Sequence, residues 1–339
     1  MIPDFSESRV RPTEVTTAKE LYDLLDENNP LWRHGDWVFR GQPDASKALL
    51  PTALRPEFMK KYVVPVAEPC LHEFMERQRD KPSNFNDFRY RRNRFPGDLH
   101  FDSEEYLERY FRLATHTAVE KCIVWAFERL ADRAALDVPH ERGSTWGGSG
   151  RRSLDDELEK IIEEKPRRQQ FLPNHNVFAL ARHHALPVRM LDWTVRPHKA
   201  AFFAADQSTS CNQSSDDLVV WAVDRETLES SGSLRLFEPL RTPIGFLRSQ
   251  EGLFMYDLDA DETFMMNGNW QPFDDRLFQF PNHNQAYKFV LPRMEADELL
   301  FLLRSKGITK SNLMPSYDNV AWEITSGRID WKRIHMDSK

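Results

Sequence analysis

Two short stretches of this sequence hold the residue types that could bind or transform an anionic ligand. The first is Phe39-Arg40-Gly41-Gln42, in which an arginine directly precedes a glycine. Arginine offers a planar fork of donors that suits phosphate or carboxylate, and glycine lets a ligand or a neighbouring backbone approach closely. From the residues alone, an arginine that pairs with a buried acid to hold a turn explains the pattern equally well.

The second stretch runs from Arg182 to His198 and concentrates arginine, histidine, aspartate, tryptophan and threonine around an apolar segment. Buried polar groups need partners, and so dense a group usually forms a hydrogen-bonded network. Arg189 and Asp192 are three residues apart, which places them on opposite faces of a regular strand. They need not pair with each other.

The spacing of other reactive residues excludes several familiar sites. His183 and His184 are adjacent, so on a helix their side chains point about 100° apart and rarely share one ion. HExxH, GxSxG, GxGxxG and P-loop strings are absent, and the three cysteines form no CxxC pair. We therefore predict no metal site, no disulfide framework and no Rossmann or Walker nucleotide site.

A basic run at residues 89–95 is a candidate nucleic-acid contact, because it interleaves arginines with two aromatic residues that could stack on bases. Its arginines are Arg89, Arg91, Arg92 and Arg94. The whole chain is acidic, with a formal charge of −7 and a pI of about 5.9, so any basic face must be local. A solvated loop that balances nearby acids is the alternative.

The composition is that of a folded protein. The chain has 339 residues, of which 40% are hydrophobic and 29% charged, so it can bury a core. The N-terminus has neither a basic start nor an apolar core, and eighteen apolar residues never run together. These patterns predict a cytoplasmic protein with no signal peptide and no membrane partner.

Apolar periodicity and turn residues predict the elements that would position the two stretches. Helices are expected over residues 17–25, 67–79, 103–133, 154–164, 174–184, 198–206 and 295–306. Strands are expected over residues 37–40, 186–192, 218–223, 252–256 and 286–291. Early helices followed by mixed strands and helices favour an α+β fold with a mixed or antiparallel sheet over regular βαβ alternation.

Three motifs together resemble the FRG domain family. Phe39-Arg40-Gly41-Gln42 is similar to the string that names the family, and residues 182–204 resemble its longest motif. A third match is Arg248-Ser249-Gln250-Glu251-Gly252-Leu253-Phe254. The resemblance spans residues 18–322, with 1–17 and 323–339 as tails and with elaborations near 85–100, 138–172 and 258–284. Segment 258–284 is a candidate lid or partner surface.

The sequence departs from the family pattern beside the central motif. Arg182 stands where the family usually has glutamine, and Arg196 where serine is usual. Ala185 and Val188 replace the usual glycine and threonine. These differences put the role of the position before His183 in question, along with that of the position before Pro197.

The resemblance implies a bacterial or phage-conflict effector, acting in defence or as a toxin. The order of the motifs also resembles that of ADP-ribosyltransferase sites, with NAD as the substrate that is cleaved. On this hypothesis Arg40 binds the pyrophosphate or ribose, Thr194 positions the ribose, and Gln250 or Glu251 stabilises the developing charge. Ligand-binding roles would fall to the following residues: Gly41, Gln42, His183, Arg189, Asp192 and Trp193.

Other functions stay open on the same residues. A sensing or interaction module without catalysis would use Arg40 and Arg189 as an anion pocket, and a protein or nucleic acid as partner. A purely structural network of Arg40, Arg189, Asp192 and Gln250 is a further alternative. Convergence of Arg40, Thr194 and Gln250 on one open cleft would favour the enzyme, whereas burial would favour the scaffold.

Overall fold

The computed structural model describes eight segments of the chain: residues 13–79, 104–139, 153–163, 175–210, 217–230, 232–239, 245–277 and 286–326. Within them, seven strands form one sheet in the order β1-β7-β4-β2-β3-β6-β5. Every neighbouring pair is antiparallel except β1 and β7, so the sheet is mixed. The predicted α+β fold is confirmed.

The strands are short, and the exposed two-residue β1 differs from the central strands, which are mostly buried. They are β1 (Thr13–Glu14), β2 (Trp37–Gln42), β3 (Leu191–Thr194), β4 (Leu218–Asp224), β5 (Leu234–Phe237), β6 (Gly252–Asp257) and β7 (Ala286–Leu291). All seven residues of β4 are buried, as expected for a central strand that is covered on both faces.

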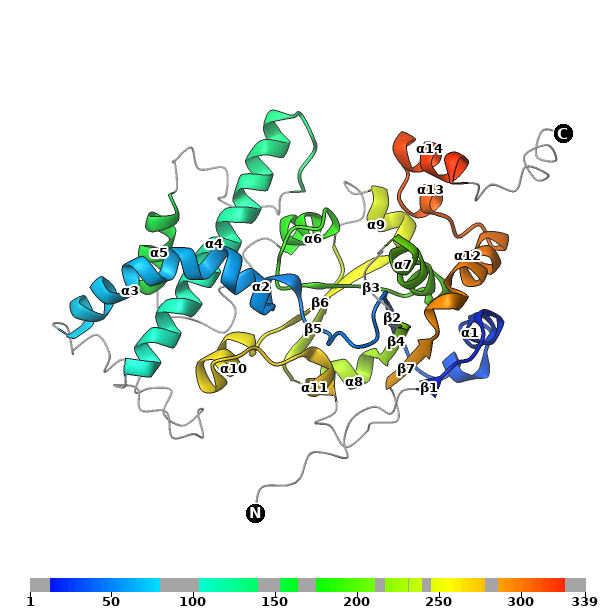
Figure 1. The fold of residues 1–339 in the computed structure, drawn as a ribbon, viewed down its shortest axis with the longest axis horizontal. Coiled ribbons are helices and arrows are strands. Elements are labelled where there is room, and N and C mark those ends of the chain that lie inside the picture. Colours follow the sequence, from blue (N-terminus) through cyan, green and yellow to red (C-terminus); the bar gives the residue numbers. More distant parts are fainter. Residues whose placement is uncertain are drawn as a thin grey trace, which may run out of the picture.

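Helices surround the sheet, and turns and irregular segments connect the elements (Figure 1). The longer ones are α1 (Ala18–Leu24), α3 (Val64–Arg79), α4 (Glu104–Arg133), α5 (Leu154–Glu163), α6 (His175–His183), α7 (Pro197–Ser210), α10 (Ala260–Asn267), α12 (Ala296–Ser305) and α14 (Tyr317–Thr325). The shorter helices are α2 (Pro56–Phe58), α8 (Arg225–Ser230), α9 (Gly245–Gln250), α11 (Phe273–Leu277) and α13 (Lys310–Leu313). Three-residue 3₁₀ turns lie at η2 (Pro30–Trp32), η3 (Thr52–Leu54) and η8 (Arg293–Glu295), and a π-helical turn lies at η4 (Met59–Val63).

Two layers of apolar side chains cover opposite faces of the sheet. On one face, α1, α7 and α12 pack against Phe39, Val220 and Phe289. On the other face, α8 and α11 pack against Val38, Trp193 and Trp221. Separate apolar clusters hold α3, α4, α5 and α10 together and pack α6 against α4 and against Phe254 of β6. Figure 1 shows α3, α4 and α5 beyond one end of the sheet, α1 and α12 towards the other end, and α7 over the central strands.

The sheet is continuous but narrows at its centre. β2 pairs with β4 along six residues, whereas within the described strands β2 and β3 share a single residue pair, Phe39 with Thr194. The strands therefore diverge beside Arg40 and Asp192. Both stretches that the sequence singles out meet at this divergence.

Most predicted elements are found close to their expected bounds, and Thr17 caps α1 by accepting a hydrogen bond from the Glu20 amide. The prediction of a strand over residues 186–192 was wrong about its bounds, because β3 begins only at Leu191 and continues to Thr194. Pro187 has no N–H, and the Arg189 amide donates to the Glu120 carboxylate at 2.7 Å, so neither residue can extend the ladder. Arg189 consequently lies before the strand rather than on it.

Candidate functional site

Asp192 on β3 is the acid around which two arginines gather. Arg182, at the end of α6, donates to Asp192 Oδ2 from Nε at 3.1 Å and from Nη2 at 2.8 Å. Arg40 on β2 donates from Nη1 to the Asp192 carbonyl at 2.6 Å and to its Oδ2 at 3.3 Å. The Asp192 side chain is 44% exposed, against 11% for Arg40 and 17% for Arg182. The carboxylate is thus held by two nearly buried guanidinium groups and faces solvent.

Arg55 adds a third guanidinium group to this place, which we call the arginine cluster: Arg40, Arg55 and Arg182 around Asp192. Burial lowers the pKa of Arg40 to about 10, with Asp192 opposing the fall and the charges of Arg182 and Arg55 adding to it. Burial and the charge of Arg182 likewise lower the pKa of Arg55, against a contribution from the exposed Glu57. The arginines are therefore close enough to repel one another.

The single carboxylate at the centre stays ionised. Desolvation opposes the charge on Asp192, but Arg182 and Arg40 outweigh it and lower the pKa of its carboxyl. Two guanidinium groups thus bind this one partly exposed carboxylate, and Arg55 adds a third positive charge that acts on both of them, so positive charge is in excess here. Such an excess suits an anionic ligand, because charge-assisted hydrogen bonds to phosphate or carboxylate are the strong ones.

Arg40 also lies in a row of side chains that crosses one face of the sheet. Direct cross-strand pairing places Lys288, Trp221 and Arg40 side by side, and Trp193 follows from the Phe39–Thr194 register. Lys288 Nζ lies 5.1 Å from the centre of the Trp221 ring. The buried Nε of Arg40 and the indole nitrogens of Trp193 and Trp221 have no hydrogen-bond partner among the described residues. The row therefore has unused donors.

The Thr194 end of β3 forms a second group with the residues that precede β6. The buried Thr194 hydroxyl donates to the Gln250 carbonyl at 2.7 Å and accepts from the Arg196 amide at 3.1 Å. The Gln250 side chain turns away and donates to the Leu313 carbonyl of α13 at 3.2 Å. In the contacts of the described residues, the Thr194 side chain thus contacts Gln250 only through the Gln250 backbone. Neither side chain reaches Arg40 in those contacts.

Glu251 is the charged centre of this second group. Its carboxylate accepts from Arg196 Nε at 2.9 Å and from Lys199 Nζ at 2.8 Å. Desolvation opposes this charge, but the bonds from Arg196 and Lys199 lower the pKa of Glu251. Its φ of +49° lies in the left-handed region, which a glutamate seldom adopts. Backbone strain of this kind clusters at functional sites.

Gly41 and Gln42, which were predicted to bind a ligand, take packing positions. A Cβ atom on Gly41 would lie 2.0 Å from the Ala200 carbonyl oxygen, so the backbone of α7 makes the close approach that the glycine permits. The buried Gln42 side chain donates to the Lys47 carbonyl at 3.0 Å and holds the turn after β2.

Arg189 belongs to a different, buried network and does not meet Arg40. Its Nε donates to Glu120 at 2.6 Å and its Nη1 to Asp261 at 3.0 Å. Its Nη2 lies 3.3 Å from His116 Nδ1. Burial opposes the charge on Arg189, but the two carboxylates outweigh it and raise its pKa. Buried ion pairs of this kind hold a fold together only when both partners are present.

The remaining predicted residues are distributed around the arginine cluster. His183 follows Arg182 at the end of α6, and burial together with the neighbouring His184 lowers its pKa. Trp193 is buried in the apolar layer beneath the sheet. Sequence reasoning missed Arg55 and Thr52 and gave Arg182 no role. Their signal was faint: Arg182 appeared only as a departure from the family pattern, and Arg55 lies in no motif.

Several expectations fall outside this geometry. Arg89, Arg91, Arg92 and Arg94 lie outside the described residues. Across the residues that are described, no group of three or more His, Cys, Asp or Glu is placed to hold a metal ion. In that same part of the chain, no helix combines the length and the apolar character needed to cross a bilayer.

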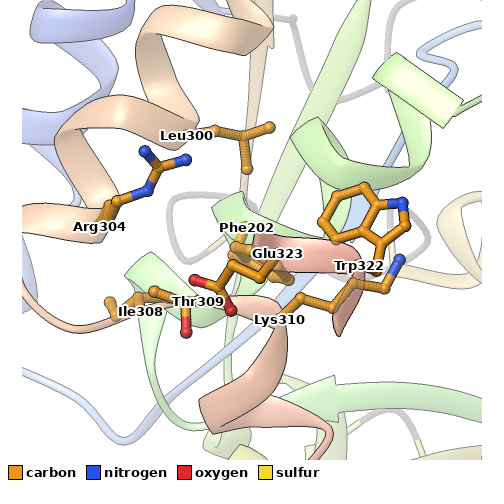
Figure 2. Close-up of a pocket in the computed structure, with 8 residues that line it drawn as sticks. All are labelled: Phe202, Leu300, Arg304, Ile308, Thr309, Lys310, Trp322 and Glu323. Carbon is orange, nitrogen blue, oxygen red and sulfur yellow. The ribbon is translucent and has the colours of Figure 1, made fainter. Parts of the chain in front are cut away.

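A small pocket lies apart from both groups, between α7, α12 and the C-terminal helices (Figure 2). Phe202 and Leu300 supply apolar walls, and Lys310 and Trp322 stand on its other side. Its volume is about 20 Å³, which suits one water molecule rather than a nucleotide. Lys310 is already occupied by Asp206 at 3.3 Å and by the Trp322 ring at 4.3 Å.

Comparison with known proteins finds a family match in the central part of the chain. The family model of the FRG domain matches residues 107–213, which run from within α4 to just beyond α7. This range contains Arg182, Arg189, Asp192 and Thr194, whereas Arg40 and Gln250 lie outside it. No curated protein and no solved structure matches the chain.

Proposed function

We propose that this chain, which carries an FRG domain, binds a phosphate-bearing ligand through the arginine cluster. One observation carries the proposal: Arg40 and Arg182 both donate to the same partly exposed Asp192 Oδ2, and the positive charge of Arg55 acts on each of them. An anion would relieve that repulsion and would accept hydrogen bonds from planar, preorganised forks. A cluster that served stability alone would gain from a second acid, and among the described residues the acid that acts on Arg55 is the exposed Glu57.

NAD is the first candidate ligand. NAD joins two phosphates to two riboses. Along β3, the arginine cluster lies at Asp192 and could bind the phosphates, and the polar side chain of Thr194 could bind a ribose. Alternate residues of a strand are about 7 Å apart, so a ligand anchored at Arg182 would extend to the second group around Glu251. The resemblance of the motif order to ADP-ribosyltransferases supports the same ligand.

Isothermal titration calorimetry with NAD, ADP-ribose and inorganic pyrophosphate tests the binding. We expect Arg182→Gln and Arg55→Gln each to weaken binding about tenfold, because each removes one charged donor worth about 1.5 kcal/mol or more. Arg112→Gln is the matched control, since Arg112 pairs with Glu108 on α4 at 2.9 Å, outside the cluster. Raising the salt concentration should weaken binding by the wild-type protein as well.

The proposal fails if none of the three probes binds. It also fails if a probe binds with the same affinity to wild type, Arg55→Gln and Arg182→Gln. Equal weakening by the control would show a general charge effect rather than a site.

A second candidate function is cleavage of NAD, favoured by the left-handed backbone of Glu251 beside Thr194. Cleavage of the nicotinamide–ribose bond passes through an oxocarbenium-like centre, which a nearby carboxylate stabilises. Arg196 and Lys199 keep Glu251 ionised for that role. Gln250 would position the site without contacting NAD, because its side chain donates to α13 and its carbonyl accepts from Thr194.

NAD consumption by the purified protein, with and without nucleic acid or cell lysate as acceptor, tests cleavage. Glu251→Gln should abolish turnover while NAD still binds, and Glu298→Gln, an exposed change on α12, should leave turnover intact. Turnover that survives in Glu251→Gln would exclude this role. The effector role in defence that the resemblance implies depends on this activity.

A further inference from the structure

We propose that His116, a fully buried residue of α4, is a positioning residue for the arginine cluster. This inference rests on the proposed function, because what His116 positions is the anion site. His116 acts through η3 (Thr52–Leu54), the short turn from which two side chains reach the cluster.

The η3 turn holds both Arg182 and Arg55 in place. The Thr52 hydroxyl accepts from Arg182 Nη1 at 3.3 Å, which leaves Arg182 anchored at one end by Asp192 and at the other by η3. Arg55 follows the turn directly, and its Nε donates to the Leu50 carbonyl at 3.0 Å. A shift of this turn would therefore move Arg55 and break the hydrogen bond between Thr52 and Arg182.

His116 fixes the turn from the interior. Its Nε2 donates to the Ala53 carbonyl at 2.8 Å, and both residues are fully buried. The imidazole stands between two aromatic rings, with ring centres 5.2 Å from Phe58 and 4.5 Å from Trp270. Both the hydrogen bond and the orientation of the ring are thereby set.

The other ring nitrogen is also committed. Arg189 Nη2 lies 3.3 Å from His116 Nδ1, and because a guanidinium can only donate, Nδ1 must accept. The neutral tautomer with its proton on Nε2 satisfies both contacts at once. Arg189 is itself fixed by Glu120 and Asp261, so a chain of hydrogen bonds leads from these acids to η3.

This series of hydrogen bonds gives the buried charges around Arg189 a role, although they make no direct contact with the arginine cluster. Groups that bind a ligand must be held by further residues whose own conformations are fixed. At metal sites, loss of such a support typically weakens binding about 10- to 100-fold, and we expect the lower end of that range here. The buried network around Arg189 anchors α4 and α10, and His116 passes that anchoring to the cluster.

Two substitutions separate positioning from mere stability. His116→Gln places an amide donor near Nε2 and keeps the bond to Ala53, whereas His116→Asn keeps an acceptor near Nδ1 and loses that bond. With inorganic pyrophosphate as the calorimetric probe, we expect His116→Asn to weaken binding about tenfold. His116→Gln should bind with nearly wild-type affinity. Thr52→Val, a change of similar volume on the turn itself, should weaken binding without disturbing the core.

The combination of Thr52→Val with His116→Asn gives the sharpest readout. If both act on the turn, the double variant should lose less than the product of the two single effects. Hydrogen exchange of the amides of residues 52–55 should be faster in His116→Asn than in His116→Gln.

The outcomes separate this inference from the proposed function. Weakening by Arg182→Gln but not by folded His116→Asn or by Thr52→Val would overturn the role of His116 alone. Failure of pyrophosphate to bind the wild-type protein, or full binding by Arg182→Gln, would overturn the anion site and this inference with it. If His116→Asn does not fold, unchanged binding by Thr52→Val suffices to overturn the role of the turn.

Discussion

The Arg40 guanidinium donates a 2.6 Å hydrogen bond to the backbone carbonyl of Asp192, beside the point where β2 and β3 stop pairing. A side chain therefore occupies an acceptor that a regular ladder would use for a neighbouring strand. The same guanidinium reaches the Asp192 carboxylate at 3.3 Å, so one arginine binds both the strand and its acidic side chain.

Arg40→Lys should destabilise the fold by about 2 kcal/mol, because a lysine keeps the charge but lacks the planar guanidinium that places Nη1 against both acceptors of Asp192. Urea unfolding followed by circular dichroism measures this change. Lys19→Arg on the exposed face of α1 serves as the control for the exchange of cations, and it should leave the midpoint unchanged. An unchanged midpoint in Arg40→Lys would show that the Asp192 carbonyl has no need of this donor.

Asp192→Asn and Arg182→Gln should shift anion affinity in opposite directions. The first removes the acid that competes with a ligand for the arginines, so pyrophosphate should bind several-fold more tightly. The second removes a donor, so binding should weaken. Calorimetry at one ionic strength compares them. If both substitutions weaken binding alike, Asp192 serves to orient the arginines more than it opposes the ligand.

The free energy of unfolding should fall as the pH drops from about 6.5 towards 3. Burial and the neighbouring Arg189 lower the pKa of His116 to about 3 in the folded protein, whereas an unfolded histidine titrates near 6.5. Between these values the unfolded chain binds one more proton at this residue. His116 then costs about 1.4 kcal/mol of stability per pH unit, and its contribution is complete above pH 6.5.

His116→Gln isolates this residue from the other titrating groups. The difference in unfolding free energy between wild type and His116→Gln should be constant above pH 6.5 and should shrink below it. The other buried histidines contribute equally to both proteins and cancel. A difference that stays constant down to pH 4 would mean that folded His116 becomes protonated to imidazolium as readily as it does in the unfolded chain.

Gly41→Ala should destabilise the protein by about 3 kcal/mol or more, because the new methyl group would overlap the backbone of α7. Gly232→Ala is a useful comparison, since its Cβ atom meets nothing within 4 Å and its cost comes from a φ of +70° alone. Thermal unfolding of the two variants checks the order. A smaller loss at Gly41 than at Gly232 would show that α7 can move away without cost.

Much of the fold could be predicted because its elements obey local rules. The buried run of β4 and the capped start of α1 are visible in the sequence as an apolar segment and a Thr-x-x-Glu pattern. The start of β3 was misplaced because its boundary depends on a carboxylate from Glu120, which is distant in the sequence. Strands as short as β1 and β5 carry too few residues to show a period.

The candidate site was predictable only in part for a related reason. Arg40 and Asp192 could be singled out by residue type, but which arginine would face which acid depends on the packing of α6 and η3. Arg189 was expected near Arg40, yet its partners come from α4 and α10. Gly41 was a candidate for ligand approach, and the neighbouring backbone proved to be that of α7.

The narrow junction of β2 and β3 has a mechanical consequence. One backbone pair and the Arg40 guanidinium join the four strands β1, β7, β4 and β2 to the three strands β3, β6 and β5 within the described sheet. If a force pulled these two groups of strands apart, the backbone ladder would have its fewest residue pairs to separate along this line. The sheet should therefore open first between β2 and β3, beside the arginine cluster.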